Sequence, residues 1–513
     1  MLNKLLTLLK PAPNWRDLLA GFTVALILIP QSIAYAELAG LPPIQGLYAA
    51  IFPLVVAAIF ASSPWLQTGP VAMTSILIFG ALSSLAVPGT EEYISLAALL
   101  ALTVGLARVV ISFARAGFVV YLMSQPVLDG FTTAAAVLIL STQIPAFFGV
   151  DTAGGNVLVS LISVFSAPAQ WSVQSMLLGM MTIVLLVIGK RIHALFPGVL
   201  LAVILGIAYQ RLFDCQCETI GYIPIDLPEI SLALPWHRID ELILPGFVIA
   251  LVGFAEPAAI ARTLAASNRR PWSANREFLS QGAANLVAGI TSAFPVGGSF
   301  SRTLISHTAG ATSRWSGAIT GLVVLVFLPA ANILSSLPKA VLAAIIIGAV
   351  FPLIKFGPLL QLMRSSRAQS LVAWVTFLLT LILSPRIDLA VLFGMGLGIA
   401  VHLWRERRIN IVSRYVEHTL HLEPTGVLFF GSANSLDETL VEELVKHPDV
   451  ETLILDLRRL GRIDYTGALV IQRVATEAEL AGLEVQVIPG QPPQGARLLR
   501  RVFGEGSNWI VEP

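Results

Sequence analysis

The chain has 513 residues, of which 56% are hydrophobic and only 12% are charged. Soluble domains are usually about 45–50% apolar and about 25% charged, so this composition excludes a disordered, collagen-like or disulfide-rich secreted protein and argues against an ordinary soluble enzyme. The 32 lysines and arginines nearly balance the 31 acidic residues, and a net charge of +1 gives no basic excess of the kind that indicates a nucleic-acid partner.

The composition changes once along the chain. Up to about residue 404, long apolar runs alternate with short polar breaks, and from about residue 409 charged residues become dense. The basic cluster Arg405, Arg407 and Arg408 lies at the change. We therefore predict a transmembrane domain over residues 1–408 and a cytoplasmic domain over residues 409–513.

Fourteen segments of the first domain are candidates for membrane spans, since a span needs about 20 mostly apolar residues. They form two sets of seven, within residues 17–210 and 240–404. The segments are 17–38, 44–60, 68–86, 93–114, 126–149, 173–189, 192–210, 240–265, 275–294, 299–311, 315–334, 337–354, 369–384 and 388–404. The third and the tenth are too short or too rich in glycine and proline to cross alone, and composition by itself allows ten to fourteen spans.

The positive charges predict the orientation of the chain. An even number of spans with the N-terminus inside places both termini in the cytoplasm. Most lysines and arginines of the first domain, Arg108, Lys190 and Arg314 among them, then fall in cytoplasmic segments, as the positive-inside rule requires. The first segment is interpreted as a span and not as a cleaved signal peptide, because no small-residue cleavage site follows a short apolar core.

Two helices seven spans apart share a sequence pattern. Residues Pro30–Ala34 and Pro257–Ala261 both read P-x-x-I-A. Thr68–Pro70 opens the third segment, and Val296–Ser299 opens the tenth at nearly the same spacing. Because seven is odd, the two repeats have opposite orientations, and paired segments broken by glycine or proline in inverted repeats indicate the binding site of a transporter.

The two broken segments predict an anion site. A half-helix that begins inside the membrane leaves its first backbone N–H groups without partners, and the helix dipole makes that end positive. Two such ends that face each other would hold an anion. Hydroxyl side chains lie close to both breaks: Thr68, Thr74 and Ser75 beside one, and Ser299, Ser301 and Thr303 beside the other. The alternative is that glycine and proline merely kink both helices for packing.

A charged residue inside a membrane span is energetically costly and is a functional candidate by default, and Glu256 and Arg302 are the main candidates of this kind. Glu256 lies midway along the eighth segment. Removal from water favours the neutral form of a carboxyl group, which suits proton coupling, while the ionised form could help to hold Na⁺. Arg302 follows the break in the tenth segment, where it could bind an oxyanion, neutralise Glu256 or reach the cytoplasm. Gln31 and Tyr35 share one face of the first helix and offer polar contacts.

The last hundred residues are typical of a small α/β domain. Gly426–Gly431, Thr452–Leu457 and Val485–Ile488 are predicted strands, the second being nearly continuous in apolar residues, as buried strands are. Leu436–His447 has helical spacing. Ile463–Ala468 opens another helix, with Asp464 or Thr466 as its N-cap.

The sequence contains no pattern that is typical of an enzyme. The chain has no nucleotide-binding fingerprint, no nucleophile–base pair and no metal-ligand spacing among its seven histidines. Cys215 and Cys217, one residue apart, are predicted to be two loop thiols. We expect no enzymatic activity, no cofactor, no metal site and no nucleic-acid partner.

Several long motifs, in order, resemble the sulfate permease (SulP) family of anion transporters. They are Pro30–Ala36 followed by Ala39–Tyr48, Glu256 followed by Ile260–Thr263, and Gly298–Thr303 followed by Ala309–Ala311. Residues 409–513 resemble a STAS domain, the usual cytoplasmic appendage of that family. Tyr465 stands where phosphoregulated STAS domains have Ser or Thr, so we do not expect a serine-kinase switch there.

The resemblance implies an α-helical polytopic membrane protein of about 14 spans, arranged as a 7+7 inverted repeat with two half-helices. A core bundle holds spans 1–4 and 8–11, a gate bundle holds the others, and the anion lies between the third and tenth half-helices. The substrate-binding residues that it implies are Gln31, Tyr35, Val71, Ala72, Ser299, Phe300, Ser301 and Arg302, with Glu256 as the coupling residue. Ser306 stands where many members have Asn, which leaves the substrate open.

We therefore expect a secondary active transporter of a small anion in the inner membrane, embedded in the lipid bilayer and, by family analogy, a homodimer. Proton-coupled sulfate uptake is the first choice. Na⁺-coupled bicarbonate transport and H⁺-coupled C4-dicarboxylate transport are the near alternatives. An uncoupled anion channel and a membrane sensor with the STAS domain as its output are alternatives of a different class.

Overall fold

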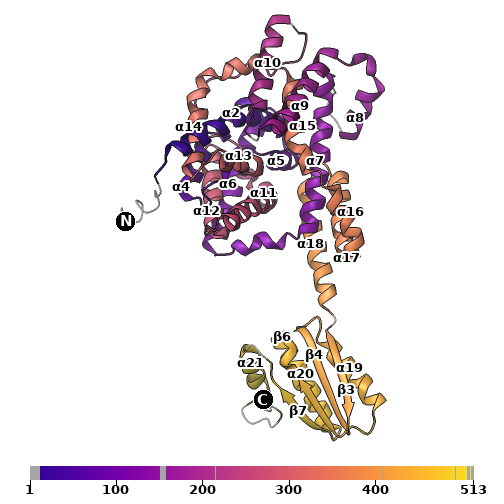
Figure 1. The fold of residues 1–513 in the computed structure, drawn as a ribbon. Coiled ribbons are helices and arrows are strands. Elements are labelled where there is room, and N and C mark those ends of the chain that lie inside the picture. Colours follow the sequence, from indigo (N-terminus) through magenta and orange to yellow (C-terminus); the bar gives the residue numbers. More distant parts are fainter. Residues whose placement is uncertain are drawn as a thin grey trace. The chain divides into compact units, whose positions relative to one another are not determined.

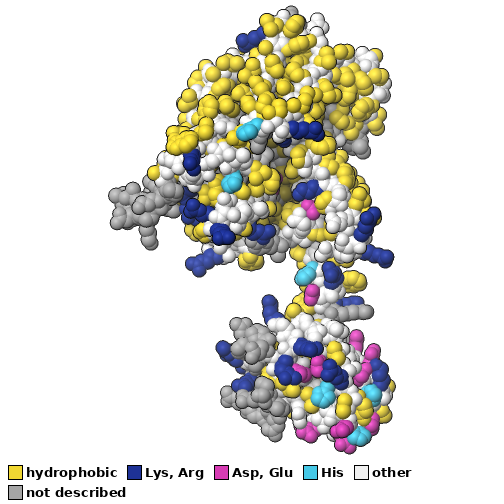
Figure 2. Space-filling view, viewed as in Figure 1, with side chains coloured by type: hydrophobic (Ala, Val, Ile, Leu, Met, Phe, Trp, Pro, Cys, Tyr) yellow, Lys and Arg dark blue, Asp and Glu magenta, His cyan; other side chains and the backbone are white. Residues whose placement is uncertain are grey.

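The computed structural model describes residues 12–150, 157–193, 195–213, 215–407, 409–490, 493–504 and 509. The chain divides into two compact units, Met1–Gly398 and Ile399–Pro513 (Figure 1). Hydrophobic side chains dominate the visible surface of the first unit, and charged side chains are dense on the second (Figure 2). Arg408, at the predicted domain boundary, lies outside the described residues.

The first unit consists of helices and two short strands. Its first half contains α2 (Trp15–Leu38), α3 (Pro43–Ala49), α4 (Phe52–Phe60), α5 (Ala72–Leu82), α6 (Glu91–Phe113), α7 (Gln125–Phe148), α8 (Val157–Ser166), α9 (Val173–Ile192) and α10 (Gly198–Phe213). Its second half contains α11 (Ile239–Ser267), α12 (Ala274–Ile290), α13 (Phe300–Thr308), α14 (Trp315–Phe327), α15 (Lys339–Val350), α16 (Phe356–Ser365), α17 (Arg367–Ile382) and α18 (Ile387–Glu406). A helix occupies each of the fourteen predicted segments.

The helices differ in whether they can cross a membrane alone. Nine in the described part of the chain are long and apolar enough to do so. The third and tenth segments hold α5 and α13, of only 11 and 9 residues, as predicted for half-helices. The total number of spans stays a prediction.

The helices of the first unit pack in two groups. α2, α4, α6, α11, α12 and α14 contact one another, with α5 and α13 among them, and α7, α9, α10, α15 and α17 form a second set of contacts. These two groups correspond to the predicted core and gate bundles.

Two arginines that were predicted in cytoplasmic segments are buried within the protein. Arg108 on α6 is 0% exposed and Arg314, just before α14, is 7% exposed. Each donates hydrogen bonds to backbone carbonyl oxygens of other segments, Arg314 to that of Ala61 at 3.0 Å. The distribution of charged residues along the sequence cannot predict this burial, because the carbonyl groups that accept the hydrogen bonds are distant in sequence.

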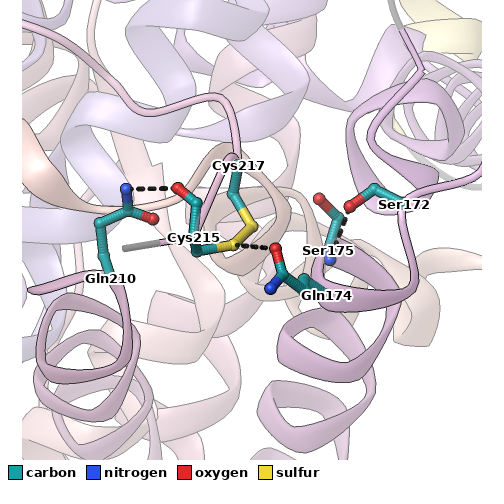
Figure 3. The surroundings of a disulfide bond; sticks show 6 residues. All are labelled: Ser172, Gln174, Ser175, Gln210, Cys215 and Cys217. Atoms are coloured by element: carbon teal, nitrogen blue, oxygen red, sulfur yellow. Dashed lines mark hydrogen bonds between the residues drawn. A yellow bond between two sulfur atoms is a disulfide. The ribbon is translucent and has the colours of Figure 1, made fainter. Parts of the chain in front are cut away.

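Cys215 and Cys217, predicted as free loop thiols, form a disulfide in the structure (Figure 3). Their Cα atoms are 5.2 Å apart, within the range that a disulfide spans. Nε2 of Gln210, on the last turns of α10, donates a 2.8 Å hydrogen bond to the Cys215 carbonyl oxygen. The prediction of two thiols was therefore wrong, because the backbone brings the two Cα atoms to within 5.2 Å of each other.

The second unit is a sheet packed with helices. Its strands are β3 (Asn410–Val416), β4 (Thr419–Leu428), β5 (Thr452–Asp456), β6 (Leu460–Ile463) and β7 (Glu484–Ile488), and its helices are α19 (Asn434–Lys446), α20 (Tyr465–Leu480) and α21 (Pro493–Phe503). The strand order is β3-β4-β5-β7, with β6 paired to β4; only β3 and β4 are antiparallel. β3 and β6 were not predicted, and β4 lies earlier than the predicted strand at 426–431.

Asp464 is the N-cap of α20. Its Oδ1 accepts a 2.7 Å hydrogen bond from the backbone N–H of Gly467. Thr466, the other candidate cap, lies inside the helix. Asp464 also accepts a 3.2 Å hydrogen bond from the N–H of Phe430, so the cap fastens α20 to the end of β4.

Candidate anion-binding site

Two three-residue strands join the half-helices. β1 (Gln67–Gly69) pairs antiparallel with β2 (Gly297–Ser299), so that Gly69 lies opposite Gly297. Two residues separate β1 from the start of α5, and α13 begins directly after β2. Because the strands are antiparallel, the two helices start at opposite ends of this short sheet, which we call the β1–β2 junction. The pairing satisfies non-helical backbone groups inside the helical unit, as a membrane interior requires.

A cavity of about 190 Å³ lies beside the β1–β2 junction, between the core and gate groups. The core wall contains eight of the nine predicted site residues: Gln31, Tyr35, Val71, Ala72, Glu256, Ser299, Phe300 and Ser301. Helices α9, α10 and α15 supply the other wall, with Lys190, Val199 and Ile345 among the lining residues. Residues from four separate core helices thus meet at one cavity.

Arg302, the ninth predicted residue, lies behind the cavity wall and does not line it. The side chain is 1% exposed, and its Nη2 donates a 2.8 Å hydrogen bond to the carbonyl oxygen of Pro70. Its Nε and Nη1 have no hydrogen-bond partner among the described residues. A guanidinium stays charged, so this buried group supplies fixed positive charge next to the cavity.

The start of α13 is organised by Ser299. The Ser299 side chain accepts a 3.4 Å hydrogen bond from the backbone N–H of Arg302 and caps the helix. Its carbonyl oxygen accepts a 2.5 Å hydrogen bond from Oγ1 of Thr303. The carboxyl group of Glu256 interacts with the charges of Lys355 and Arg302 and with the backbone of Phe300. The predicted coupling residue and the predicted anion site therefore share the first turn of α13.

Three buried polar atoms on α2 and in the first turn of α5 lack a hydrogen-bond partner among the described residues. They are Oε1 of Gln31, Oγ1 of Thr74 and Oγ of Ser75. Buried polar groups are normally paired, so unpaired ones need an explanation. Of these three residues Gln31 lines the cavity, and its unpaired oxygen is consistent with a polar ligand there.

Two supporting residues were missed by sequence reasoning. Nε2 of Gln281 donates a 2.6 Å hydrogen bond to Oγ1 of Thr68, on β1. Asn285 donates from Nδ2 to the carbonyl oxygen of Val296 and accepts from its N–H, both at 2.9 Å. Gln281 and Asn285 are fully buried on α12. Their four-residue spacing on one face of an apolar helix was the available signal.

Comparison with known proteins agrees with this architecture. Residues 15–376 match the family model of the sulfate permease family, and residues 410–503 match that of the STAS domain. Probable sulfate transporter 4.2 of Arabidopsis thaliana is 30% identical, over 92% of this chain and 75% of the relative. A probable sulfate transporter of Mycobacterium tuberculosis is 34% identical, over 70% of this chain and slightly less than two thirds, 65%, of the relative.

Two solved structures share the fold. The murine Solute Carrier 26 family member A9 anion transporter, in the inward-facing state, has a TM-score of 0.88 at 22% identity and covers 97% of this chain and 89% of its own. The transmembrane domain of a cyanobacterium bicarbonate transporter, BicA, has a TM-score of 0.64 at 22% identity, covering 75% and 97%. The family match extends over most of the chain. The chain therefore belongs to the sulfate permease family and is a multi-pass membrane anion transporter with a C-terminal STAS domain, not an enzyme.

Proposed function

We propose that the chain takes up sulfate together with protons across the inner membrane, and that the anion binds in the 190 Å³ cavity. The observation that carries the proposal is the pairing of β1 with β2 beside this cavity. It places two helix N-termini at one wall, and each end carries partial positive charge and free N–H groups. Arg302, buried directly behind the wall, adds a full charge.

In this proposal the cavity residues have separate roles. Backbone amides at the start of α5, near Val71 and Ala72, and at the start of α13, near Phe300, bind the anion from two sides. The hydroxyl groups of Ser299 and Ser301 face the same cavity and donate hydrogen bonds to the oxygen atoms of the anion. Gln31 and Tyr35 bind it from α2. All these residues are neutral, so the positive field on the core side of the cavity comes from Arg302 and the helix ends, and Lys190 adds a positive charge on the opposite wall.

Coupling follows from the location of Glu256 on the same wall. An ionised carboxylate would repel a divalent anion across a cavity of low dielectric constant, and a protonated one would not. Sulfate and a proton on Glu256 therefore favour each other's binding. This linkage makes the loaded, protonated state the one that moves across the membrane.

The names of the curated relatives support sulfate as the substrate. The likeness to a bicarbonate transporter rests on fold alone and does not favour bicarbonate over sulfate. For the orientation we propose that both termini face the cytoplasm, as the positive-inside pattern predicts, and for the assembly a homodimer.

The test is labelled sulfate uptake into liposomes that contain the purified full chain, driven by an inward proton gradient. Bicarbonate, fumarate and chloride serve as competitors. Glu256→Gln should abolish gradient-driven accumulation and leave sulfate exchange intact. Glu241→Gln, at the exposed start of the same helix and in a salt bridge with Arg238, is the matched control and should accumulate sulfate as the native chain does.

Each contrary outcome overturns a separate part of the proposal. Undiminished accumulation in Glu256→Gln removes this residue as the coupling group. Flux of fumarate or bicarbonate without flux of sulfate replaces the substrate. Sulfate currents across planar bilayers that need no second gradient indicate an uncoupled channel, and the absence of any anion flux favours a sensor.

A further inference from the structure

A second buried arginine approaches the β1–β2 junction from α6. Arg108 is 0% exposed. Its Nη1 donates to the carbonyl oxygen of Val296 at 2.9 Å, its Nε to that of Ala250 at 3.2 Å and its Nη2 to that of Ile249 at 3.3 Å. No acidic side chain in the described part of the chain forms an ion pair with it. Carbonyl groups satisfy its hydrogen bonds and leave its formal charge uncompensated.

Arg108 and Arg302 hold neighbouring carbonyl groups. Gly69 pairs with Gly297 in antiparallel register, so the next residues outward, Pro70 and Val296, lie side by side at one end of the junction. Arg302 binds the carbonyl oxygen of Pro70, and Arg108 binds that of Val296. Two fixed positive charges therefore flank the same end of the short sheet.

The guanidinium of Arg108 also lies beside the first turn of α5. A Cβ atom on Gly253 would stand 2.9 Å from Nη2 of Arg108 and 3.2 Å from Oγ1 of Thr74. Thr74 is the third residue of α5, and its hydroxyl has no partner among the described residues. The absence of a side chain at Gly253 thus lets the charge of Arg108 approach the positive end of this half-helix.

We propose that Arg108 is a specificity-determining residue of the anion site, which acts through its charge to favour divalent over monovalent anions. The inference rests on the proposed function, in that the anion must bind beside the β1–β2 junction. A buried charge is screened little by salt, and its Coulomb energy is proportional to the charge of the anion. Its removal therefore weakens the binding of a dianion twice as much, in free energy, as that of a monoanion.

The expected size of the effect follows from Coulomb's law. A unit charge taken to lie about 12 Å from the anion, at an effective dielectric constant of about 20, changes the affinity for a monoanion about tenfold and for a dianion about a hundredfold. The ratio of the two affinities then falls about tenfold. A residue that only supports the fold would lower both affinities by the same factor and leave the ratio unchanged.

The experiment measures equilibrium binding of sulfate and of nitrate to the purified full chain. Arg108→Gln removes the charge and keeps one donor, and it should lower the sulfate-to-nitrate affinity ratio about tenfold. Arg108→Lys keeps the charge without the guanidinium fork, and it should retain the ratio even if both affinities fall. Arg314→Gln, at another buried arginine that binds a carbonyl group, is the control and should retain it too.

A second variant covers the case in which Arg108→Gln does not fold. Asn285 donates to the same Val296 oxygen as Arg108, so Asn285→Asp places a negative charge of equal size beside the guanidinium. This variant should lower the ratio as Arg108→Gln does. An unchanged ratio in a folded Arg108→Gln or Asn285→Asp chain overturns the inference. If the native chain binds neither anion, or if Ser301→Ala leaves both affinities unchanged, the proposed anion site itself is wrong.

Discussion

Gln281 donates a 2.6 Å hydrogen bond from its Nε2 to Oγ1 of Thr68 and so fastens helix α12 to strand β1. One turn later on the same helix, Asn285 binds both backbone groups of Val296, next to β2. α12 contributes no residue to the cavity wall. A helix outside the cavity therefore positions the starts of both half-helices.

We expect Gln281→Leu to weaken this support. The change leaves the buried Thr68 hydroxyl without its donor, at a cost of about 1–3 kcal/mol in the free energy of unfolding. Both the melting temperature and the affinity for sulfate should fall, because β1 carries the start of α5. Gln143→Leu, where the amide donates only to its neighbour Thr142, should leave both quantities unchanged; an equal loss there would refute the specific role of Gln281.

Ser299 and Ser301 line the same cavity with different structural roles. Ser299→Ala removes the N-cap of α13 and should lower both stability, by about 1 kcal/mol, and anion affinity. Ser301→Ala removes a hydroxyl that does not cap the helix, so it should lower sulfate affinity while the melting temperature stays constant. Thermal unfolding and sulfate binding of both variants test the distinction, and equal melting shifts would contradict it.

Gly46 allows α3 to pack against α2 beside the site. A Cβ atom there would stand 2.0 Å from the carbonyl oxygen of Ser32, the neighbour of Gln31. The backbone must shift to relieve this overlap, so Gly46→Ala should destabilise the chain by about 1–3 kcal/mol or more and disturb anion binding. At Gly357, where no atom lies within 4 Å of an added Cβ, the same change should be neutral. Comparing the melting temperatures of the two variants decides the point.

We expect acid to destabilise the second unit at Asp456, the last residue of β5. Hydrogen bonds from Arg458 hold the pKa of Asp456 below its ordinary value. A carboxyl group with a lowered pKa stabilises the folded state above the pKa of its unfolded form, and this contribution disappears as the pH falls through the folded pKa.

We therefore expect the protection factors for amide hydrogen exchange in β5 of the full chain to fall below about pH 4, where an unfolded Asp takes up its proton. Arg458→Gln should remove most of this pH dependence, and Arg462→Gln, an exposed arginine on β6, should retain it. A native pH profile in Arg458→Gln would show that the pair contributes nothing.

The membrane character, the two repeats and the broken segments could be predicted from the sequence because each is a local property. Runs of apolar residues predict helices. Glycine and proline break a helix irrespective of the tertiary contacts, as they do at Gly69, Pro70, Gly297 and Gly298. The family motifs named the site residues, and eight of them line one cavity. The binding roles of these residues stay predictions that the proposed experiments address.

Other features could not be predicted because they depend on contacts between distant residues. Arg108 was assigned to the cytoplasmic side by its charge, and only the three carbonyl groups of Ile249, Ala250 and Val296 explain its burial. The prediction for Cys215 and Cys217 was wrong because the backbone conformation, and not the spacing in the sequence, decides whether their sulfur atoms meet. β3 was missed since most of its residues are exposed or half-buried and show no apolar alternation.

The sequence by itself determined that this protein is a membrane transporter of two repeats, since hydropathy and glycine or proline breaks act on each segment alone. Only the tertiary structure decided how the repeats meet: the register of β1 on β2, the two arginines on adjacent carbonyl groups and the support from α12. The physical reason is that a hydrogen bond or a buried charge is stable only with its partner, and these partners lie more than 140 residues apart.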